Sequence, residues 1–187
     1  MKTWTSNRRL WLYRILTLAL TALVVHLAVV WAVPRIIMHR VMNGPDAQAM
    51  QMLNRAAFLP AVDASSRKVV MPSPDMLYSA CVYDVSAAPV RVRAHPALKT
   101  YWSIALYGAN SDNFFVLNDR QAGQAPVDLW LVSKGPNTAT PAVPPGARVV
   151  VVPSPRGFLL MRVLTAHYDA EKDVLEPARR TLTCSPA

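Results

Sequence analysis

The stretch PSPDMLYSACVYDVS, residues 72–86, carries the densest β-strand signal in the sequence. Proline donates no ladder hydrogen bond, so Pro72 and Pro74 confine the strand to residues after Asp75. From there the side chains alternate between two sets, as they do when successive residues face opposite sides of a sheet. The residues of one set are Leu77, Ser79, Cys81, Tyr83 and Val85, and those of the other are Tyr78, Ala80, Val82 and Asp84.

Similar segments follow toward the C-terminus. Residues 101–107 place Trp102, Ile104 and Leu106 on one face, and residues 114–117 form a continuous apolar run typical of a buried strand. The other predicted strands are residues 90–93, 127–133, 149–152 and 158–165, the last two around a hairpin-like connection at 153–157. Sixteen prolines against six glycines favour short elements joined by loops, among them a proline-rich one at 138–146. We therefore expect a mainly β domain, antiparallel and sandwich-like or jelly-roll-like.

Upstream lies ILTLALTALVVHLAVVWAV, which begins at Ile15, ends at Val33 and contains no Lys, Arg, Asp or Glu. At about 1.5 Å per residue a helix of this length spans roughly 28 Å, close to the hydrocarbon thickness of a bilayer. A cleavable signal peptide is the alternative, but Pro34 and the bulky residues before it make a poor cleavage site. The run predicts one uncleaved transmembrane signal anchor whose partner is the lipid bilayer.

Flanking charges indicate the orientation of this anchor. Lys2, Arg8, Arg9 and Arg14 precede it, whereas Arg35 and Arg40 follow it closely. The positive-inside rule then predicts a single pass through the inner (cytoplasmic) membrane, with the N-terminus in the cytoplasm. The expected divisions are a basic cytoplasmic N-terminus at 1–14, the anchor at 15–33, a helical linker region at 34–68 and a periplasmic β-rich domain at 69–187.

Helical patterns flank the β region and predict two or three short peripheral helices. Residues 35–43 continue the anchor helix until Asn43-Gly44-Pro45 breaks it. Residues 46–58 carry apolar side chains at helical spacing and predict a short amphipathic helix. A further helical pattern covers 169–180 and is weakened by Pro177.

The net charge of +9 does not indicate nucleic-acid binding, because the four cations before the anchor serve topology and the rest are scattered. Cys81 and Cys184 lie in the part that we expect in an oxidising compartment, where an even cysteine count predicts a disulfide. The alternative is two unpaired thiols.

The sequence contains no phosphate-binding, dinucleotide-binding, zinc-protease or serine-hydrolase motif, so we expect no cofactor and favour a protein that is not an enzyme. A metal site built on His95, His167 and one of Asp75, Asp112 or Asp119 lacks supporting spacing, and we expect no metal. Polar residues in the turns could line a ligand cleft at one end of a sandwich. The candidates are Asp75, Tyr78, Tyr107, Asn113, Asp119 and Arg120. Alternatively, these residues satisfy their own turns and pack their rings locally.

Two stretches, PSPDMLYSACVYDVS and YWSIALYGANSDNFFVLNDRQ (101–121), resemble the family of domain of unknown function 1254. Its first pattern reads Asn-x-Asp-Thr-Leu-Tyr-Ser, and its second reads Tyr-Tyr-Ser-x-x-Leu-Tyr followed by Asn-Asn-Phe. Ser73 and Met76 replace the Asn and Thr of the first pattern. The matching residues are Asp75, Leu77, Tyr78, Ser79, Tyr101, Ser103, Leu106, Tyr107, Asn113 and Phe114. The resemblance covers residues 69–133 and implies a β-rich, jelly-roll-like domain.

Longer members of that family carry a second domain, so this chain resembles a short, membrane-anchored form. Together these features predict an envelope domain that binds a ligand or a partner protein, for example one carrying the related second domain. The alternative is a hydrolase or lyase acting on an envelope glycan or a small acid through Asp75 and the turns at 113–119.

Overall fold

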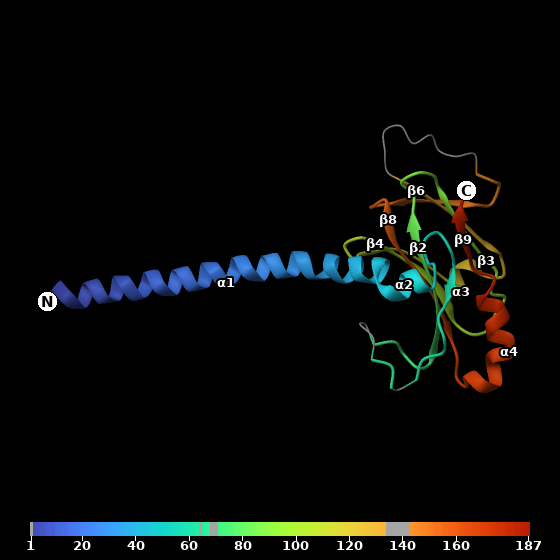
Figure 1. Ribbon diagram of the computed structural model, residues 1–187, viewed down its shortest axis with the longest axis horizontal. Helices are drawn as coiled ribbons and strands as arrows, with labels where there is room; N and C mark the ends of the chain where they lie inside the picture. Colours follow the sequence, from blue (N-terminus) through green and yellow to red (C-terminus); the bar gives the residue numbers. More distant parts are fainter. Residues whose placement is uncertain (1, 64, 68–70, 134–142) are drawn as a thin grey trace. The chain divides into compact units, whose positions relative to one another are not determined.

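The computed structural model describes residues 2–63, 65–67, 71–133 and 143–187 (Figure 1). It divides into two units, Met1–Ile37 and Met38–Ala187. Helix α1 (Lys2–Asn43) runs through the first unit and ends in the second. Within α1 the structure has one apolar stretch long enough to cross a membrane, judged by length and composition, and none of that stretch is buried. The predicted continuation of the helix through residues 35–43 is confirmed, because α1 ends at Asn43.

The described part of the second unit contains two β-sheets. Sheet A has the strand order β1-β2-β8-β4-β5, and sheet B has the order β7-β6-β3-β9. Pairing is antiparallel except between β6 and β7. The strands are β1 (Ala57–Phe58), β2 (Met76–Asp84), β3 (Val90–Ala94), β4 (Trp102–Gly108), β5 (Asn113–Asn118), β6 (Val127–Ser133), β7 (Arg148–Val152), β8 (Arg156–Leu164) and β9 (Thr183–Pro186). The mainly β prediction is confirmed.

The main core lies between the two sheets and is built from the alternate positions that the sequence marks. On β2 the inward side chains include Leu77, Cys81 and Tyr83, and on β4 they include Trp102 and Ile104. All of them are buried, so the period-two pattern has its physical cause in the burial of one strand face. The other side of each strand forms the outer face of its sheet.

The predicted disulfide is confirmed. Cys81 of β2 in sheet A is bonded to Cys184 of β9 in sheet B, and both residues belong to the core. The bridge therefore holds a four-residue edge strand, which the sequence analysis did not anticipate, against the opposite sheet.

The predicted helix over residues 46–58 is wrong beyond its first turn. Helix α2 (Pro45–Ala49) begins at Pro45 as expected but is followed by Gln51 and Asn54 with positive φ. The Asn54 side chain accepts a hydrogen bond from the Asp84 backbone N–H at 2.8 Å and donates one to the Asp84 carbonyl at 3.2 Å. The chain then enters β1 beside β2. Pairing with β2 thus overrides the local helical preference.

Residues 38–57 instead cover part of the outer face of sheet A. A second apolar cluster there joins side chains that precede β1 to outward-facing side chains of β2. Its buried members are Met38, Met42, Ala47, Met52, Ala57, Ala80 and Val82. This packing belongs wholly to the second unit.

Three further expectations need correction or qualification. Residues 114–117 lie in β5, an edge strand whose Val116 is exposed, so the run is not a buried strand. Residues 153–157 do not close a hairpin, because β7 and β8 belong to different sheets. Residues 138–142 of the predicted proline-rich loop lie outside the described residues. The short helices α3 (Asp119–Ala122) and α4 (Tyr168–Arg179) complete the unit, and α4 contains Pro177 near its end.

Candidate functional site

Strand register separates the six predicted site residues into two groups. Asp75 directly precedes β2, whose Met76 is paired with Leu164 at the end of β8. Ser103 near the start of β4 is paired with Asn118, the residue before α3. These pairings place Asp75, Tyr78, Asp119 and Arg120 toward one end of sheet A.

Tyr107 and Asn113 are Cα partners at the opposite end of sheet A, where the β4–β5 register shifts at a bulge. Tyr107 packs in the second apolar cluster, and its carbonyl accepts a hydrogen bond of 3.0 Å from the buried Tyr83 hydroxyl. Burial raises the pKa of Tyr83, which keeps that hydroxyl a donor at physiological pH. The structure therefore does not bring the six residues into one cleft.

Within the first group, part of the polar chemistry serves the turns themselves. Asn118 forms a capping box with Gln121, in which each side chain accepts from the other's backbone N–H. The Asp75 carbonyl accepts from the Thr165 N–H at 2.9 Å. Tyr78 differs, because its hydroxyl accepts a 2.8 Å hydrogen bond from the Ser73 N–H while its ring lies on the outer face of sheet A.

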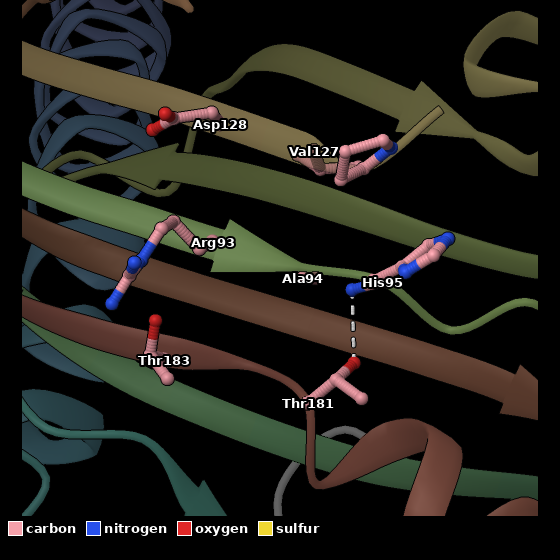
Figure 2. Close-up of a pocket in the computed structure, with 8 residues that line it drawn as sticks. Arg93, Ala94, His95, Val127, Asp128, Thr181 and Thr183 are labelled. Carbon is pink, nitrogen blue, oxygen red and sulfur yellow. Dashed lines mark hydrogen bonds between the residues drawn. The ribbon is translucent and has the colours of Figure 1, made fainter. Parts of the chain in front are cut away.

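A shallow cavity of about 330 Å³ lies on sheet B instead (Figure 2). It lies where β3 ends and β6 and β9 begin, and Arg93, Asp128 and Thr183 occupy directly opposed positions on the three strands. Figure 2 shows the His95 backbone N–H donating to the Thr181 hydroxyl, a 2.9 Å hydrogen bond that ties the end of β3 to the segment before β9. The lining residues are Arg93, Ala94, His95, Pro126, Val127, Asp128, Thr181 and Thr183.

Asp128 is the carboxylate that lines this cavity, and its neighbours keep it ionised. Arg91 binds Asp128 with two hydrogen bonds, from Nε at 2.9 Å and from Nη2 at 2.6 Å. Hydrogen bonding from Arg91, with a further contribution from the charge of Arg93, holds the pKa of Asp128 below its usual range. Asp128 is consequently a carboxylate near neutral pH and is unsuited to act as a proton donor. The cavity is thus shallow, and its one carboxylate is already bound by Arg91.

The described residues contain no group of three or more His, Cys, Asp and Glu side chains placed to hold a metal ion. His95 lies at the end of β3, and His167 directly precedes α4. From the sequence, His95 was a candidate metal ligand, whereas Arg93, Asp128 and Thr183 were not singled out. Arg93 belongs to the alternating Val-Arg-Val-Arg pattern at 90–93. Asp128 and Thr183 come beside it only through the register of three strands, which a sequence pattern does not show.

The fold and its preceding helix define a class: a disulfide-bridged two-sheet β-sandwich that follows an apolar helix long enough to span a membrane. The chain belongs to the family described as "Protein of unknown function (DUF1254)", whose model matches residues 53–186. The resemblance stated from the motifs is thereby confirmed. Among curated proteins none matches the chain.

Two solved structures are similar to the chain. The crystal structure of the VPA0106 protein from Vibrio parahaemolyticus matches with a TM-score of 0.65 at 17% identity, covering 85% of this chain and 37% of that one. An uncharacterised protein from Burkholderia cenocepacia matches with a TM-score of 0.46 at 15% identity, covering 65% of this chain and 34% of that one. The first likeness shows the fold, and the chain spans just over a third of the length of that relative.

Proposed function

We propose that the chain is a membrane-anchored domain of the cell envelope that binds a ligand or a partner protein in the periplasm. The observation that carries this proposal is the apolar stretch of α1, in which no charged residue interrupts residues 15–33 and no side chain is buried. An uncharged, exposed helical run of this length is stable in a bilayer and costly in water.

Aromatic residues near both ends of the stretch support a membrane span. Trp11 and Trp31 are exposed and lie 20 residues apart, which corresponds to about 30 Å of helix. Each ring contacts a guanidinium: Arg14 lies 5.6 Å from the centroid of Trp11, and Arg35 lies 4.3 Å from that of Trp31. Paired aromatic and basic side chains suit the two interfaces of a membrane.

The disulfide supports a periplasmic location for the β-sandwich, because structural disulfides persist in oxidising compartments and are rare in the cytosol. Basic residues before the anchor support a cytoplasmic N-terminus. We propose further that the partner carries a domain related to the second domain of the longer family members. The hydrolase or lyase alternative gains no support, since Asp75 and Asn113 lie at opposite ends of sheet A.

Cysteine labelling on intact cells tests the location. With the native disulfide left intact, so that Cys81 and Cys184 do not react, a membrane-impermeant maleimide is expected to label Arg120→Cys but not Asn7→Cys. The protein should stay in the membrane pellet after alkaline carbonate extraction. Labelling of Asn7→Cys instead, or release by carbonate, would overturn the proposal.

Cross-linking in cells tests the binding role. Replacement of residues 15–33 with an unrelated single-span helix should keep the protein anchored and preserve cross-linked products that depend on the β-sandwich. Loss of every product in that variant would instead place the interaction in the membrane helix.

A further inference from the structure

A row of side chains crosses the outer face of sheet A at the end where the strand register places Asp75 and Tyr78. Cα pairing joins Tyr78 of β2 to Arg162 of β8, Arg162 to Ser103 of β4, and Ser103 to Asn118 at the end of β5. Directly opposed residues on one face have Cβ atoms about 5 Å apart. We call these four residues the Arg162 row.

The row faces away from the core. The strand neighbours of its members point between the sheets and are buried, among them Leu77, Trp102 and Val163. The opposite half of the same outer face is covered, because Ala80 and Val82 pack under the methionines of residues 38–52. Sheet A therefore has one covered half and one half where the Arg162 row lies.

The row contains polar groups that lack partners. Ser103 is fully buried, and within the described residues its hydroxyl has no hydrogen-bond partner. The buried Nε of the half-buried Arg162 likewise has none, and no carboxylate of the described chain forms an ion pair with this arginine. These two shielded atoms can each donate a hydrogen bond, so within the described residues the row has donors to spare for an acceptor.

Exposed apolar and aromatic side chains flank the row on the same face. Tyr101 and Leu164 are 37% and 36% exposed, and the Leu164 N–H donates to the Tyr101 carbonyl at 2.9 Å, which holds the two side by side. Val116, two residues before Asn118, is 42% exposed. Tyr78, Tyr101 and Ser103 come from the two motif stretches at 72–86 and 101–121, which the sheet thus brings together.

We propose that the Arg162 row is a binding site for a carboxylate carried on a compact ring, as in a small organic acid or an acidic sugar. A rotamer change of Arg162 admits the carboxylate, which the guanidinium binds through two parallel N–H donors. The Ser103 and Tyr78 hydroxyls donate to it, and Tyr101 packs against the ring. One guanidinium balances one negative charge, which favours a carboxylate over a phosphate dianion.

This inference rests on the binding part of the proposed function, and its test does not depend on the location of the protein. Binding to the full chain in detergent micelles is measured by calorimetry and ligand-observed NMR. The probes are sodium benzoate, sodium glucuronate and a glucuronate-containing tetrasaccharide, with benzamide and glucose as neutral analogues. We expect saturable binding of at least one carboxylate probe at millimolar concentration or below and at least about tenfold weaker binding of its neutral analogue.

Variants separate a ligand site from a structural one. Arg162→Met keeps the apolar stem and should weaken carboxylate binding about tenfold or more, whereas Arg93→Met, the same charge change at an exposed position on sheet B, should leave it unchanged. Ser103→Ala should weaken binding several-fold without lowering the melting temperature, because its hydroxyl has no partner to lose in the described chain.

Two sources of the carboxylate are distinguished by the probes. Binding of benzoate or glucuronate assigns the site to free acids, and binding of the tetrasaccharide alone assigns it to an acidic polysaccharide. Absence of saturable binding by all three probes at about 10 mM, or equal affinity in wild type and Arg162→Met, would overturn the inference. Failure of the labelling experiment on cells would overturn the location and leave this result standing.

Discussion

Removal of the Cys81–Cys184 disulfide should cost the second unit a large part of its stability. The bridge joins residues that lie 103 positions apart. The chain-entropy relation gives about 4.7 kcal/mol for a closed loop of about 100 residues. Domains of this size unfold with about 5–15 kcal/mol, so the double variant Cys81→Ala/Cys184→Ala is expected to lose between about a third and nearly all of its stability. Both cysteines are buried, and truncation to alanine adds a small cavity cost in the same direction.

Urea unfolding of the full chain in detergent measures this effect. Fluorescence of Trp102, which is buried between the sheets, reports the transition. Wild-type protein kept reduced by a phosphine reductant provides a matched comparison without the substitutions and should lose a similar free energy. A loss below about 1 kcal/mol in both samples would refute the reasoning, because the native sheets would then hold the loop closed without the bridge.

The loss should also have a local signature. Strand β9 has four residues and is paired only with β3, as the edge of sheet B. Without the bridge, amide hydrogens of the paired segments around Val92 and Cys184 should exchange faster than those of β2 and β8. Equal acceleration in all strands would show that β9 opens only with the whole sandwich.

Three further predictions concern packing and charge. Gly157→Ala should destabilise the protein by about 3 kcal/mol or more in thermal unfolding, because an added Cβ would lie 2.1 Å from a buried tyrosine hydroxyl and 2.3 Å from a backbone oxygen. Arg179→Met should cost about 3 kcal/mol of unfolding free energy in urea, because this buried guanidinium bonds the carbonyls of Leu59 and Tyr78 and the carboxylate of Glu176. Arg180 is exposed and pairs with the same carboxylate, so Arg180→Met should cost less than about 1 kcal/mol. Arg91 lowers the pKa of the Asp128 carboxyl group in the folded state, so this carboxylate should stabilise the fold above its unfolded pKa. That stabilisation should be lost as the pH falls through the lowered, folded-state pKa. Acid titration should therefore show a smaller loss of unfolding free energy in Arg91→Met than in the wild type.

Sequence patterns predicted an element correctly where the local preference of its residues and their packing in the fold favour the same secondary structure. Strand β2 is an example, because its alternation follows from the burial of one face in the core. The helix predicted over 46–58 failed because Asn54 bonds the backbone of Asp84, thirty residues away, and no local pattern records that pairing. Strand β9 was missed for the same reason, since its few residues acquire a partner only through β3 and the disulfide.

Prediction of a functional site was weaker, since proximity across a sheet depends on register. The sequence grouped Asp75 with Asn113 as polar turn residues, yet the sheet places them at opposite ends. Conversely, Arg162 carries no motif and was not singled out. It becomes notable only when Tyr78 and Ser103 are found opposite it on the neighbouring strands.

The folded unit also extends beyond the family match at residues 53–186. Met38, Met42, Ala47 and Met52 all precede residue 53, and they bury Ala80 and Val82 on the outer face of sheet A. Without these side chains the sheet would expose apolar surface at its centre, which favours association with other chains. Residues 38–52 are therefore part of the domain rather than a spacer before it. The same cover also confines any ligand on this face to the half where the Arg162 row lies.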